Sequence, residues 1–358
     1  MRIFKIIAIM IAFPAYAHSW ELRIASWNIA NLAEPGNSIR NQKREQEDYT
    51  QIAKKISELR PHIIALQEIG SIPAVERILG QDYKVKFETR CYENKFNCNV
   101  SDGDIYTAIA IHKELEDRAT FFQVDSLAVD HTDECGRKNK VRGGVGVKID
   151  IGGRPTWILS VHMKAACKHD FNPDPDVQDD CEALQRQFEA LKVWMRERLN
   201  DAIIIAGDLN RHLLNPKDRI RRSIFDALGA DLHFLPQKDA RKCWQSYNFN
   251  RATLAGLRAE ALRNNPEFAA RNITPKIYLP REQRYVDFFV VINGPPTVMF
   301  ESKQVEMTGL YRFENPGETL KTCQGEIKIT NAHKREALTF GRSYPSDHCP
   351  IIMTVSTN

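Results

Sequence analysis

A carboxylate and an imidazole stand side by side near the end of this sequence, in the tripeptide Ser346-Asp347-His348. The tripeptide comes just before the apolar segment Ile351 to Val355, so we expect it at a junction between a loop and a strand. A carboxylate can bind a metal ion, and an imidazole gains and loses a proton near neutral pH. The tripeptide therefore predicts metal binding and proton transfer, provided that other parts of the chain supply partners.

Further polar residues occur where other short apolar segments end. They are Trp27-Asn28, Gln67-Glu68, His162, Gly207-Asp208-Leu209-Asn210 and Asp287. Taken singly, each has an ordinary structural interpretation, such as a solvated loop glutamate, an Asx turn or a hydrogen-bonded core histidine. Taken together, amides beside carboxylates form an oxygen-rich site that suits magnesium, which binds carboxylates, waters and substrate phosphate.

Strands and helices must bring these residues together. Short and often β-branched segments predict strands over Leu22 to Trp27, His62 to Leu66, Ile105 to Ile111, Val145 to Ile149, Trp157 to Val161, Ala202 to Ala206, Val286 to Ile292 and Ile351 to Val355. Apolar residues at helical spacing predict helices over Arg44 to Leu59 and Cys181 to Leu199. The charged segment from Lys217 to Arg271 (about 217–271) predicts a helical surface insertion, and the whole pattern indicates a mixed α/β fold.

The motifs, read in order, resemble the endonuclease/exonuclease/phosphatase superfamily, which includes deoxyribonuclease I. They are Trp-Asn, Gln-Glu, a histidine after a strand, Gly-Asp-x-Asn, Tyr-x-Asp and Ser-Asp-His, and they extend from about Leu22 to Val355. His162 to Cys167, with Cys181, is similar to a bacterial secreted branch of the superfamily. The resemblance implies one α/β domain over residues 18–358, a four-layer α/β sandwich with two mixed β-sheets face to face flanked by helices.

The resemblance also implies a metal-dependent phosphoester hydrolase. Glu68 would be the main metal ligand, with Asn28 and Asp347 near the metal or its waters. Magnesium is the expected ion, with manganese or calcium as alternatives. Asp208 and Asn210 would hold the scissile phosphate and the attacking water, and strand spacing makes these two side chains face the same way.

Two imidazoles complete the implied catalytic set. Asp287 would orient His348 and fix its tautomer, so that His348 acts as the general base or as a cation that stabilises the phosphate. The superfamily leaves open whether Asp208 or His348 takes the proton from water. His162 would hydrogen-bond the phosphate and assist the leaving oxygen, and Asp104 is the nearest candidate for its acidic partner.

The substrate is less well defined by the sequence. We expect an endonuclease that cuts DNA, with RNA as an alternative; the same scaffold also serves phosphatases, sphingomyelinase-type phospholipid phosphodiesterases and a genotoxin-like subunit. No aromatic-rich hairpin for a bilayer is evident between the motifs. A catalytically silent binding module is disfavoured, because such a protein would be free to lose the ligands that are intact here.

Basic residues near the predicted site edge could contact a phosphate backbone, although solvated surface charge explains such residues as often. Lys164 and Arg211 are the predicted substrate contacts. The others are Arg137, Lys138, Lys140, Arg142 and Lys168. The formal net charge of +4 is too small to indicate a nucleic-acid partner by itself.

The first seventeen residues have the pattern of a secretory signal peptide. Arg2 and Lys5 precede the apolar run Ile6 to Phe13, and Ala15-Tyr16-Ala17 supplies small residues for cleavage. The run is too short to span a bilayer, and no second long apolar segment follows. We therefore expect a soluble product, secreted or periplasmic, with no stable insertion into the membrane.

Eight cysteines follow the predicted signal, and an even number in an exported chain predicts disulfides. The spacing of Cys91 with Cys98 and of Cys167 with Cys181 favours local pairs. A zinc site is the competing interpretation, but the sequence has no Cys-x-x-Cys motif. The remaining cysteines suggest the pairs Cys243 with Cys323 and Cys135 with Cys349.

Overall fold

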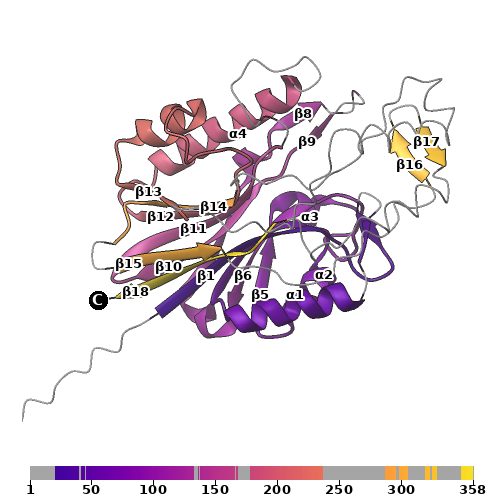
Figure 1. The fold of residues 1–358 in the computed structure, drawn as a ribbon, viewed down its shortest axis with the longest axis horizontal. Helices are drawn as coiled ribbons and strands as arrows, with labels where there is room; N and C mark the ends of the chain where they lie inside the picture. Colours follow the sequence, from indigo (N-terminus) through magenta and orange to yellow (C-terminus); the bar gives the residue numbers. More distant parts are fainter. Residues whose placement is uncertain are drawn as a thin grey trace, which may run out of the picture.

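Two six-stranded β-sheets lie face to face, and helices cover the outer face of each (Figure 1). This computed structural model describes residues 21–39, 42–44, 46–132, 136, 138–165, 167, 178–236, 287–295, 298–304, 319–322, 325–328 and 348–357. The predicted four-layer α/β sandwich is confirmed. The predicted signal peptide at 1–17 and most of the predicted insertion lie outside the described residues.

The first sheet has the strand order β15-β18-β1-β4-β6-β5. Its strands are β1 (Glu21–Leu32), β4 (Ile63–Ile69), β5 (Tyr83–Phe87), β6 (Tyr106–His112), β15 (Val298–Gln304) and β18 (Ile351–Thr357). β1 runs parallel to β4 and antiparallel to β18, so the sheet is mixed. The pairing of β1 with β18 joins the two ends of the described chain in the middle of this sheet.

The second sheet has the strand order β13-β14-β12-β11-β10-β7. Its strands are β7 (Ala119–Val124), β10 (Gly144–Ile151), β11 (Arg154–His162), β12 (Ala202–Asp208), β13 (Leu232–Leu235) and β14 (Asp287–Ile292). β11 and β12 are parallel, and β12 and β14 are antiparallel, so this sheet is mixed as well. All eight predicted strands are present in the two sheets.

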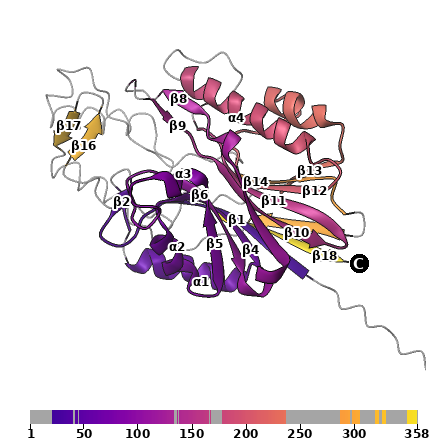
Figure 2. The same ribbon diagram turned by 180° about the vertical axis from the view of Figure 1, so that it is seen from behind.

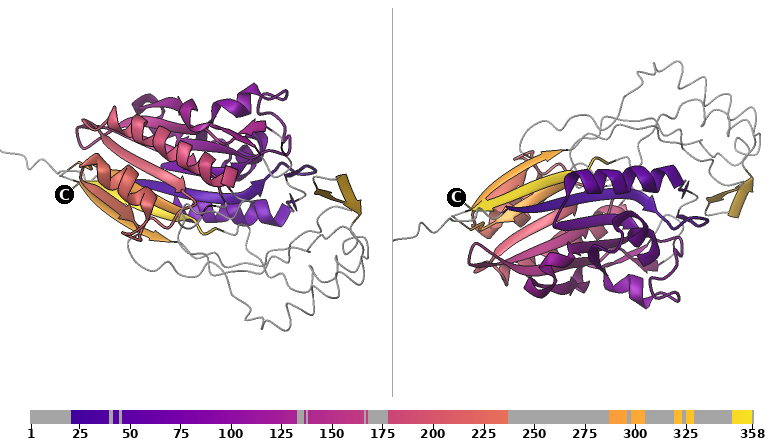
Figure 3. Two further views of the ribbon diagram at one scale, coloured as in Figure 1. Left: turned by 90° about the horizontal axis from the view of Figure 1, so that it is seen from above. Right: turned by 90° about the horizontal axis from the view of Figure 1, so that it is seen from below.

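Helices pack on the two outer faces, as Figure 3 shows from above and below. They are α1 (Gln46–Leu59), α2 (Ile72–Leu79), α3 (Thr89–Glu93) and α4 (Gln178–Arg196), with the short helices η2 (Asp125–Leu127), η4 (Arg221–Phe225) and η5 (Asp226–Leu228). A further short helix, η1 (Lys113–Arg118), instead buries Leu115 in the core between the sheets. The buried side chains of α1 and α2 pack on the first sheet, and those of α4 pack on the second. Each buried Leu, Ile or Phe contributes about 1.5–3 kcal/mol of transfer free energy.

Three two-stranded ribbons complete the described strands (Figure 2). They are β2 (Ser38–Ile39) with β3 (Gln42–Lys43), β8 (Asp130–Thr132) with β9 (Lys138–Lys140), and β16 (Thr319–Thr322) with β17 (Gly325–Lys328). None of the helices in the described ranges combines the length and the apolar character that a membrane crossing requires.

The predicted insertion from Lys217 to Arg271 needs a correction where it begins. Its first part forms η4 and η5 and then β13, which pairs with β14 in the second sheet. Phe234 on β13 is buried in the core beneath α4. This part therefore belongs to the sandwich, and the remainder of the predicted insertion, from 237 onward, lies outside the described residues.

Strand alternation decides which polar residues enter the space between the sheets. Successive side chains of a strand point to opposite faces. On β12, Ile204 and Ala206 belong to the core between the sheets, so Asp208, two residues further on, points the same way. The same alternation directs Asn28 on β1, His162 on β11 and Asp287 on β14 inward. These polar residues all lie at one end of the sandwich, because the strand register pairs His162 with Asp208 and Asp208 with Asp287.

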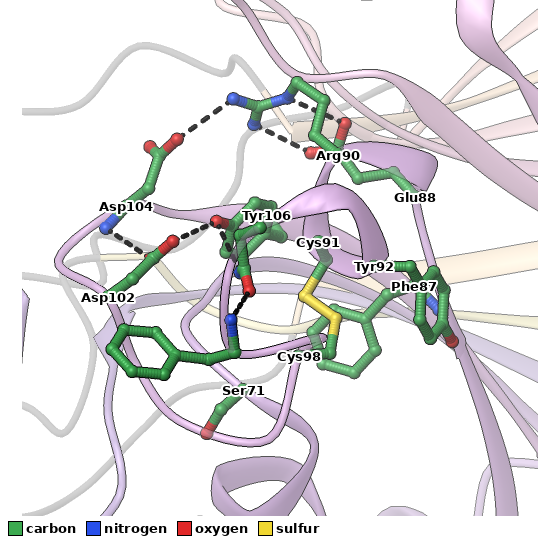
Figure 4. Close-up of a disulfide and its surroundings, with 12 residues drawn as sticks. Ser71, Phe87, Glu88, Arg90, Cys91, Tyr92, Cys98, Asp102, Asp104 and Tyr106 are labelled. Atoms are coloured by element: carbon green, nitrogen blue, oxygen red, sulfur yellow. Dashed lines mark hydrogen bonds and ion pairs between the residues drawn. A yellow bond between two sulfur atoms is a disulfide. The ribbon is translucent and has the colours of Figure 1, made fainter.

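Two disulfides are described, and both were predicted. Cys91 in α3 is bonded to Cys98 in the loop that follows (Figure 4), and their Cα atoms are 5.0 Å apart. Cys167 and Cys181 are bonded with Cα atoms 4.9 Å apart, which ties the loop after β11 to the first turn of α4. Cys349 is also disulfide-bonded. The predicted pair of Cys243 with Cys323, and Cys135, lie outside the described residues.

Gly207, directly before Asp208, provides a test of this packing. It has φ of +153°, and a Cβ atom added there would clash with the carbonyl oxygen of Val161 in the neighbouring strand. Because backbone atoms of a central strand cannot move aside, we expect Gly207→Ala to reduce the free energy of unfolding by about 3 kcal/mol or more.

The matched control is Gly229→Ala, since Gly229 also has positive φ (+65°) but has nothing within 4 Å of the added Cβ position. It should cost only about 1 kcal/mol, from backbone strain alone. Urea unfolding of both variants makes the comparison. Equal losses in the two variants would contradict the proposed clash.

Candidate active site

The carboxylate of Asp208 lies at the centre of the polar cluster between the sheets. Asn28 on the first sheet donates from Nδ2 to Asp208 Oδ2 at 3.2 Å. The Nε2 atom of His162 lies 3.6 Å from the same oxygen, and that of His348 lies 3.8 Å from it. Three side chains from separate elements thus face one carboxylate oxygen, and all of them are buried.

Asp287 and His348 form the pair that the sequence predicted. The Nδ1 atom of His348 lies 2.7 Å from Asp287 Oδ2, although 61 residues separate them in the chain. An ionised carboxylate can only accept a hydrogen bond, so Nδ1 carries the proton in this pair. The other ring nitrogen, Nε2, is therefore left to face Asp208. The pair fixes both the tautomer and the direction of the ring.

Glu68 is directed into the site by an irregularity in β4. The pairing of β4 with β6 shifts register between Gln67 and Ile69, and Glu68 has φ of +60°. A non-glycine residue in this region is uncommon and costs about 1 kcal/mol or more, which is typical of functional positions. One carboxylate oxygen of Glu68 accepts from Asn28 Nδ2 at 3.2 Å, and the other accepts from the backbone N–H of Asn31 at 3.1 Å.

Asn28 has a different orientation from that expected of a metal ligand. Its Oδ1 accepts from the backbone N–H of Ala30 at 3.0 Å, while its Nδ2 donates to both Glu68 and Asp208. In this arrangement Asn28 holds two carboxylates together as a hydrogen-bond donor. Its oxygen does not point toward them.

Hydrogen bonds join the chain segments at the ends of β11 and β12, where His162 and Asp208 lie. The backbone N–H of Met163 donates to the carbonyl of Asp208 at 2.9 Å, and Asn210 donates from Nδ2 to the carbonyl of Met163 at 3.0 Å. Asn210 has φ of +49°, and its N–H bonds to Asp208 Oδ1. Strand β12 has ended at Asp208, so Asn210 does not have the strand geometry that was expected.

Burial raises the pKa of Asp208 to about 7. The negative charge of Asp287 and that of Glu68 act in the same direction, whereas His348 and the N–H of Asn210 oppose the shift. A carboxyl group titrating near neutral pH can exchange a proton during a reaction.

The side chains of the site fit a divalent metal ion. Asp208, Asp287 and His348 offer ligand atoms that lie within 4.8 Å of one another, and Asn28 joins Glu68 to this group by donating to both Glu68 and Asp208. Asp287 Oδ1 is buried, and among the described residues no group hydrogen-bonds to it. Crowded carboxylates with an unused oxygen suit a hard cation, which would offset their repulsion. Asp347, a predicted ligand, lies outside the described residues.

The two predicted substrate contacts are engaged elsewhere. Lys164 pairs through Nζ with Asp180 at 2.6 Å at the start of α4. Arg211 is fully buried, with Nε 2.7 Å from Asp218 Oδ2 and Nη1 3.0 Å from the carbonyl of Cys167. The prediction for Arg211 is therefore corrected. Its buried side chain joins the loop at Cys167 to the segment at Asp218, so it is not positioned to contact substrate.

Asp104, the predicted acidic partner of His162, is engaged elsewhere as well. Its carboxylate pairs with Arg90 (Figure 4), with Oδ2 at 3.0 Å from Nη1. Arg90 also pairs with Glu88, which is fully buried. The carboxylates described near His162 are instead Glu68, at 3.9 Å, and Asp208.

Other residues support the site and were missed or misread in the sequence. Arg142, expected to track phosphate, is buried and donates to the carbonyls of His162 and Met163 at 3.1 and 2.7 Å. Gln187 on α4 bonds to the carbonyl of Arg142 and to the N–H of Lys164. The sequence could have pointed to Gln187, because it is a polar residue on the apolar face of the helix predicted over Cys181 to Leu199.

The raised pKa of Asp208 predicts how the metal-free protein responds to pH. Because the folded state holds this proton up to about pH 7 and the unfolded state releases it near the ordinary value of 3.8, stability should decrease as pH rises through 7. We expect a loss of about 2 kcal/mol between pH 5 and pH 8. Thermal unfolding with chelator measures it. Asp208→Asn, which cannot titrate, should remove this decline, and identical pH profiles for the two proteins would contradict the assignment.

Several solved structures are similar to this chain over most of its length. The solved structures similar to this chain include D. rerio TDP2 complexed with single strand DNA product (15% identity, 94% of this chain and 99% of that chain, TM-score 0.49). An endonuclease/exonuclease/phosphatase family protein from Bacteroides thetaiotaomicron has 15% identity, 95% and 99% coverage, and a TM-score of 0.48. The human Nocturnin catalytic domain with bound sulfate has 14% identity, 94% and 95% coverage, and a TM-score of 0.46.

The comparison with curated proteins gives no match. The model of the Endonuclease/Exonuclease/phosphatase family matches residues 25–289, which is most of the chain and includes Asn28, Glu68, His162, Asp208 and Asp287. The protein therefore belongs to the Endonuclease/Exonuclease/phosphatase family and is a divalent-metal-dependent phosphoester hydrolase.

Proposed function

We propose that the protein is a secreted endonuclease that hydrolyses DNA, with magnesium as its metal ion. The observation that supports this best is the convergence of two imidazoles on one carboxylate: the Nε2 atoms of His162 and His348 lie 3.6 and 3.8 Å from Asp208 Oδ2. The site thus places the imidazole of His162, which can donate toward an anionic phosphate, beside Asp208 and His348 Nε2, which can accept a proton from water.

A phosphodiester is an anion that repels hydroxide. A catalyst must neutralise its non-bridging oxygens, align a water with the leaving oxygen and stabilise the charge that develops there. Magnesium held by Glu68, with Asp347, would supply charge neutralisation and would activate the water.

The chain's own residues perform the remaining tasks. Asp208, with its pKa near 7, accepts the proton of the attacking water and can pass it on to His348. Asp287 holds His348 with Nε2 toward the reacting groups. His162 donates toward the phosphate and assists the leaving oxygen. Arg142 holds His162 in place by donating to its main-chain carbonyl.

The described surface favours nucleic acid over a bilayer substrate. An enzyme that acts on membrane phospholipids needs an exposed apolar surface. In the described ranges, the exposed large apolar side chains are Val100 before β6, Val193 on α4 and Met299 on β15, so they belong to three separate segments. Export is supported by the N-terminal sequence pattern and by the disulfides Cys91–Cys98 and Cys167–Cys181.

The direct experiment treats the purified mature protein with plasmid DNA, RNA, sphingomyelin vesicles and a phosphomonoester. We expect plasmid nicking and linearisation that chelator abolishes and that magnesium or manganese restores. Glu68→Gln should lose most of the activity, because magnesium is held by only one or two carboxylates. Its metal affinity, measured by calorimetry, should fall in parallel. Hydrolysis of sphingomyelin or the monoester without nuclease activity would overturn the substrate assignment.

A second prediction concerns the Asp287–His348 pair. Asp287→Asn keeps the shape of the side chain but allows the wrong tautomer, so we expect turnover to fall by about 10²- to 10⁴-fold. The Michaelis constant should change little if the pair acts mainly in the transition state.

The control is Asp201→Asn. Asp201 accepts a hydrogen bond from Trp157 at 2.8 Å and belongs to the loop before β12, at the opposite end of that strand from Asp208. This variant should retain normal turnover. Near-normal rates for Asp287→Asn on DNA would refute the assigned role.

A further inference from the structure

We propose that Trp27 is a positioning residue for His348, and the proposal rests on the catalytic role of His348 given above. The indole Nε1–H of Trp27 donates to the main-chain carbonyl of His348 at 3.0 Å, across 321 residues of sequence. Asp287 holds the ring of His348, and Trp27 holds its backbone. Together the two bonds fix the position of the His348 backbone and the orientation of its imidazole ring.

The two bonds come from opposite sides of the sandwich. Trp27 belongs to β1 of the first sheet, and Asp287 belongs to β14 of the second sheet. His348 and Trp27 are both buried, with 7% and 2% of their surfaces exposed. His348 is therefore attached to both sheets, so its ring keeps its place only while the two sheets keep theirs.

The sheet itself cannot hold the backbone at His348. The ladder between β1 and β18 ends with the pair Ser26 and Ile351. The residue before Ile351 is Pro350, which has no N–H group to continue the ladder. The indole of Trp27 binds the chain beyond that point, from a residue adjacent to the last paired residue on β1.

A tryptophan suits this task because its donor is fixed by packing. The ring of Trp27 packs in the core between the first sheet and its helices, with Ile29 and Leu66 among its cluster. The indole N–H can only donate, and it lies at the edge of a rigid ring. Phenylalanine would fill most of the same space without the donor.

Loss of this bond should move the imidazole. His348 Nε2 lies 3.8 Å from Asp208 Oδ2, so a shift of about 1 Å would change the geometry at the reacting atoms. Misplacement on that scale can cost about 100-fold in rate. The effect should appear in turnover, since Trp27 itself does not reach the substrate.

The test compares Trp27→Phe with Trp157→Phe in the mature, metal-loaded protein. The indole N–H of Trp157 also donates a partly buried hydrogen bond, to Asp201 at 2.8 Å, but Trp157 lies at the far end of the second sheet from the site. With plasmid DNA, we expect Trp27→Phe to lower kcat by about 10- to 100-fold with KM changed less than about threefold. Trp157→Phe should keep kcat within about twofold of the parent.

A second readout separates positioning from general loss of stability. Both variants are expected to lower the melting temperature, so the comparison uses the NMR signal of the His348 Nδ1 proton, which reports its bond to Asp287. That signal should shift or broaden in Trp27→Phe and stay unchanged in Trp157→Phe. An unchanged signal with kcat close to that of the parent would overturn the proposal, as would equal loss of kcat in both variants.

If Trp27→Phe does not fold, the parent protein decides the question. The indole N–H of Trp27, assigned with nitrogen-15 tryptophan and Phe variants of the other tryptophans, should be protected from hydrogen exchange as core amides are. Exchange within seconds would refute the bond. His348→Ala distinguishes this proposal from the proposed function: full activity in His348→Ala refutes the role of His348, whereas loss in His348→Ala with a normal Trp27→Phe refutes only the inference about Trp27.

Discussion

The burial of the Asp208 carboxylate is the constraint on which the rest of the site depends. A carboxylate removed from water must find donors or hold a proton. Here Asn28 on the opposite sheet donates to Oδ2 of Asp208, and the N–H of Asn210 donates to Oδ1. The imidazoles of His162 and His348 also approach Oδ2. Neither sheet could supply this environment alone. The spacing between the sheets, which the apolar core sets, therefore also sets the chemistry of the site.

Strained backbone at the site is stabilised by groups that take no part in the chemistry. Ala30, Asn31 and Glu68 have positive φ, at costs of about 1 kcal/mol or more each. The buried guanidinium of Arg44 donates to the carbonyls of Ile29 and Ala30, and the Tyr49 hydroxyl donates to that of Ala33. These hydrogen bonds go to carbonyls near the end of β1, where the pairing of β1 with β4 is irregular. The first helix and the loop before it thus hold the polar end of β1 in place.

The sequence allowed the central strands to be predicted, because they are short, apolar and β-branched on both faces. The edge strands β5, β7, β13 and β15 were missed, since polar residues such as Lys84 and Gln123 interrupt their apolar pattern. The polar residues at strand ends were predicted to lie close together, and Asn28, His162 and His348 do lie around Asp208. The orientation of Arg142 and Arg211 could not be predicted, because the carbonyls that they bind, those of His162, Met163 and Cys167, belong to segments distant in sequence. The contact of Trp27 with His348 has no local signal at all.

The pairing of β1 with β18 has a consequence for the order of events during synthesis. A ribosome adds about 5–20 residues per second. The 321 residues that separate Trp27 from His348 therefore take roughly 16 to 64 seconds to produce. Throughout that interval β1 lacks one of its two neighbours and the imidazole of residue 348 does not exist. Until residue 348 has been added, the nascent chain therefore lacks both the imidazole to which the proposed function assigns proton transfer and the carbonyl that the Trp27 indole binds.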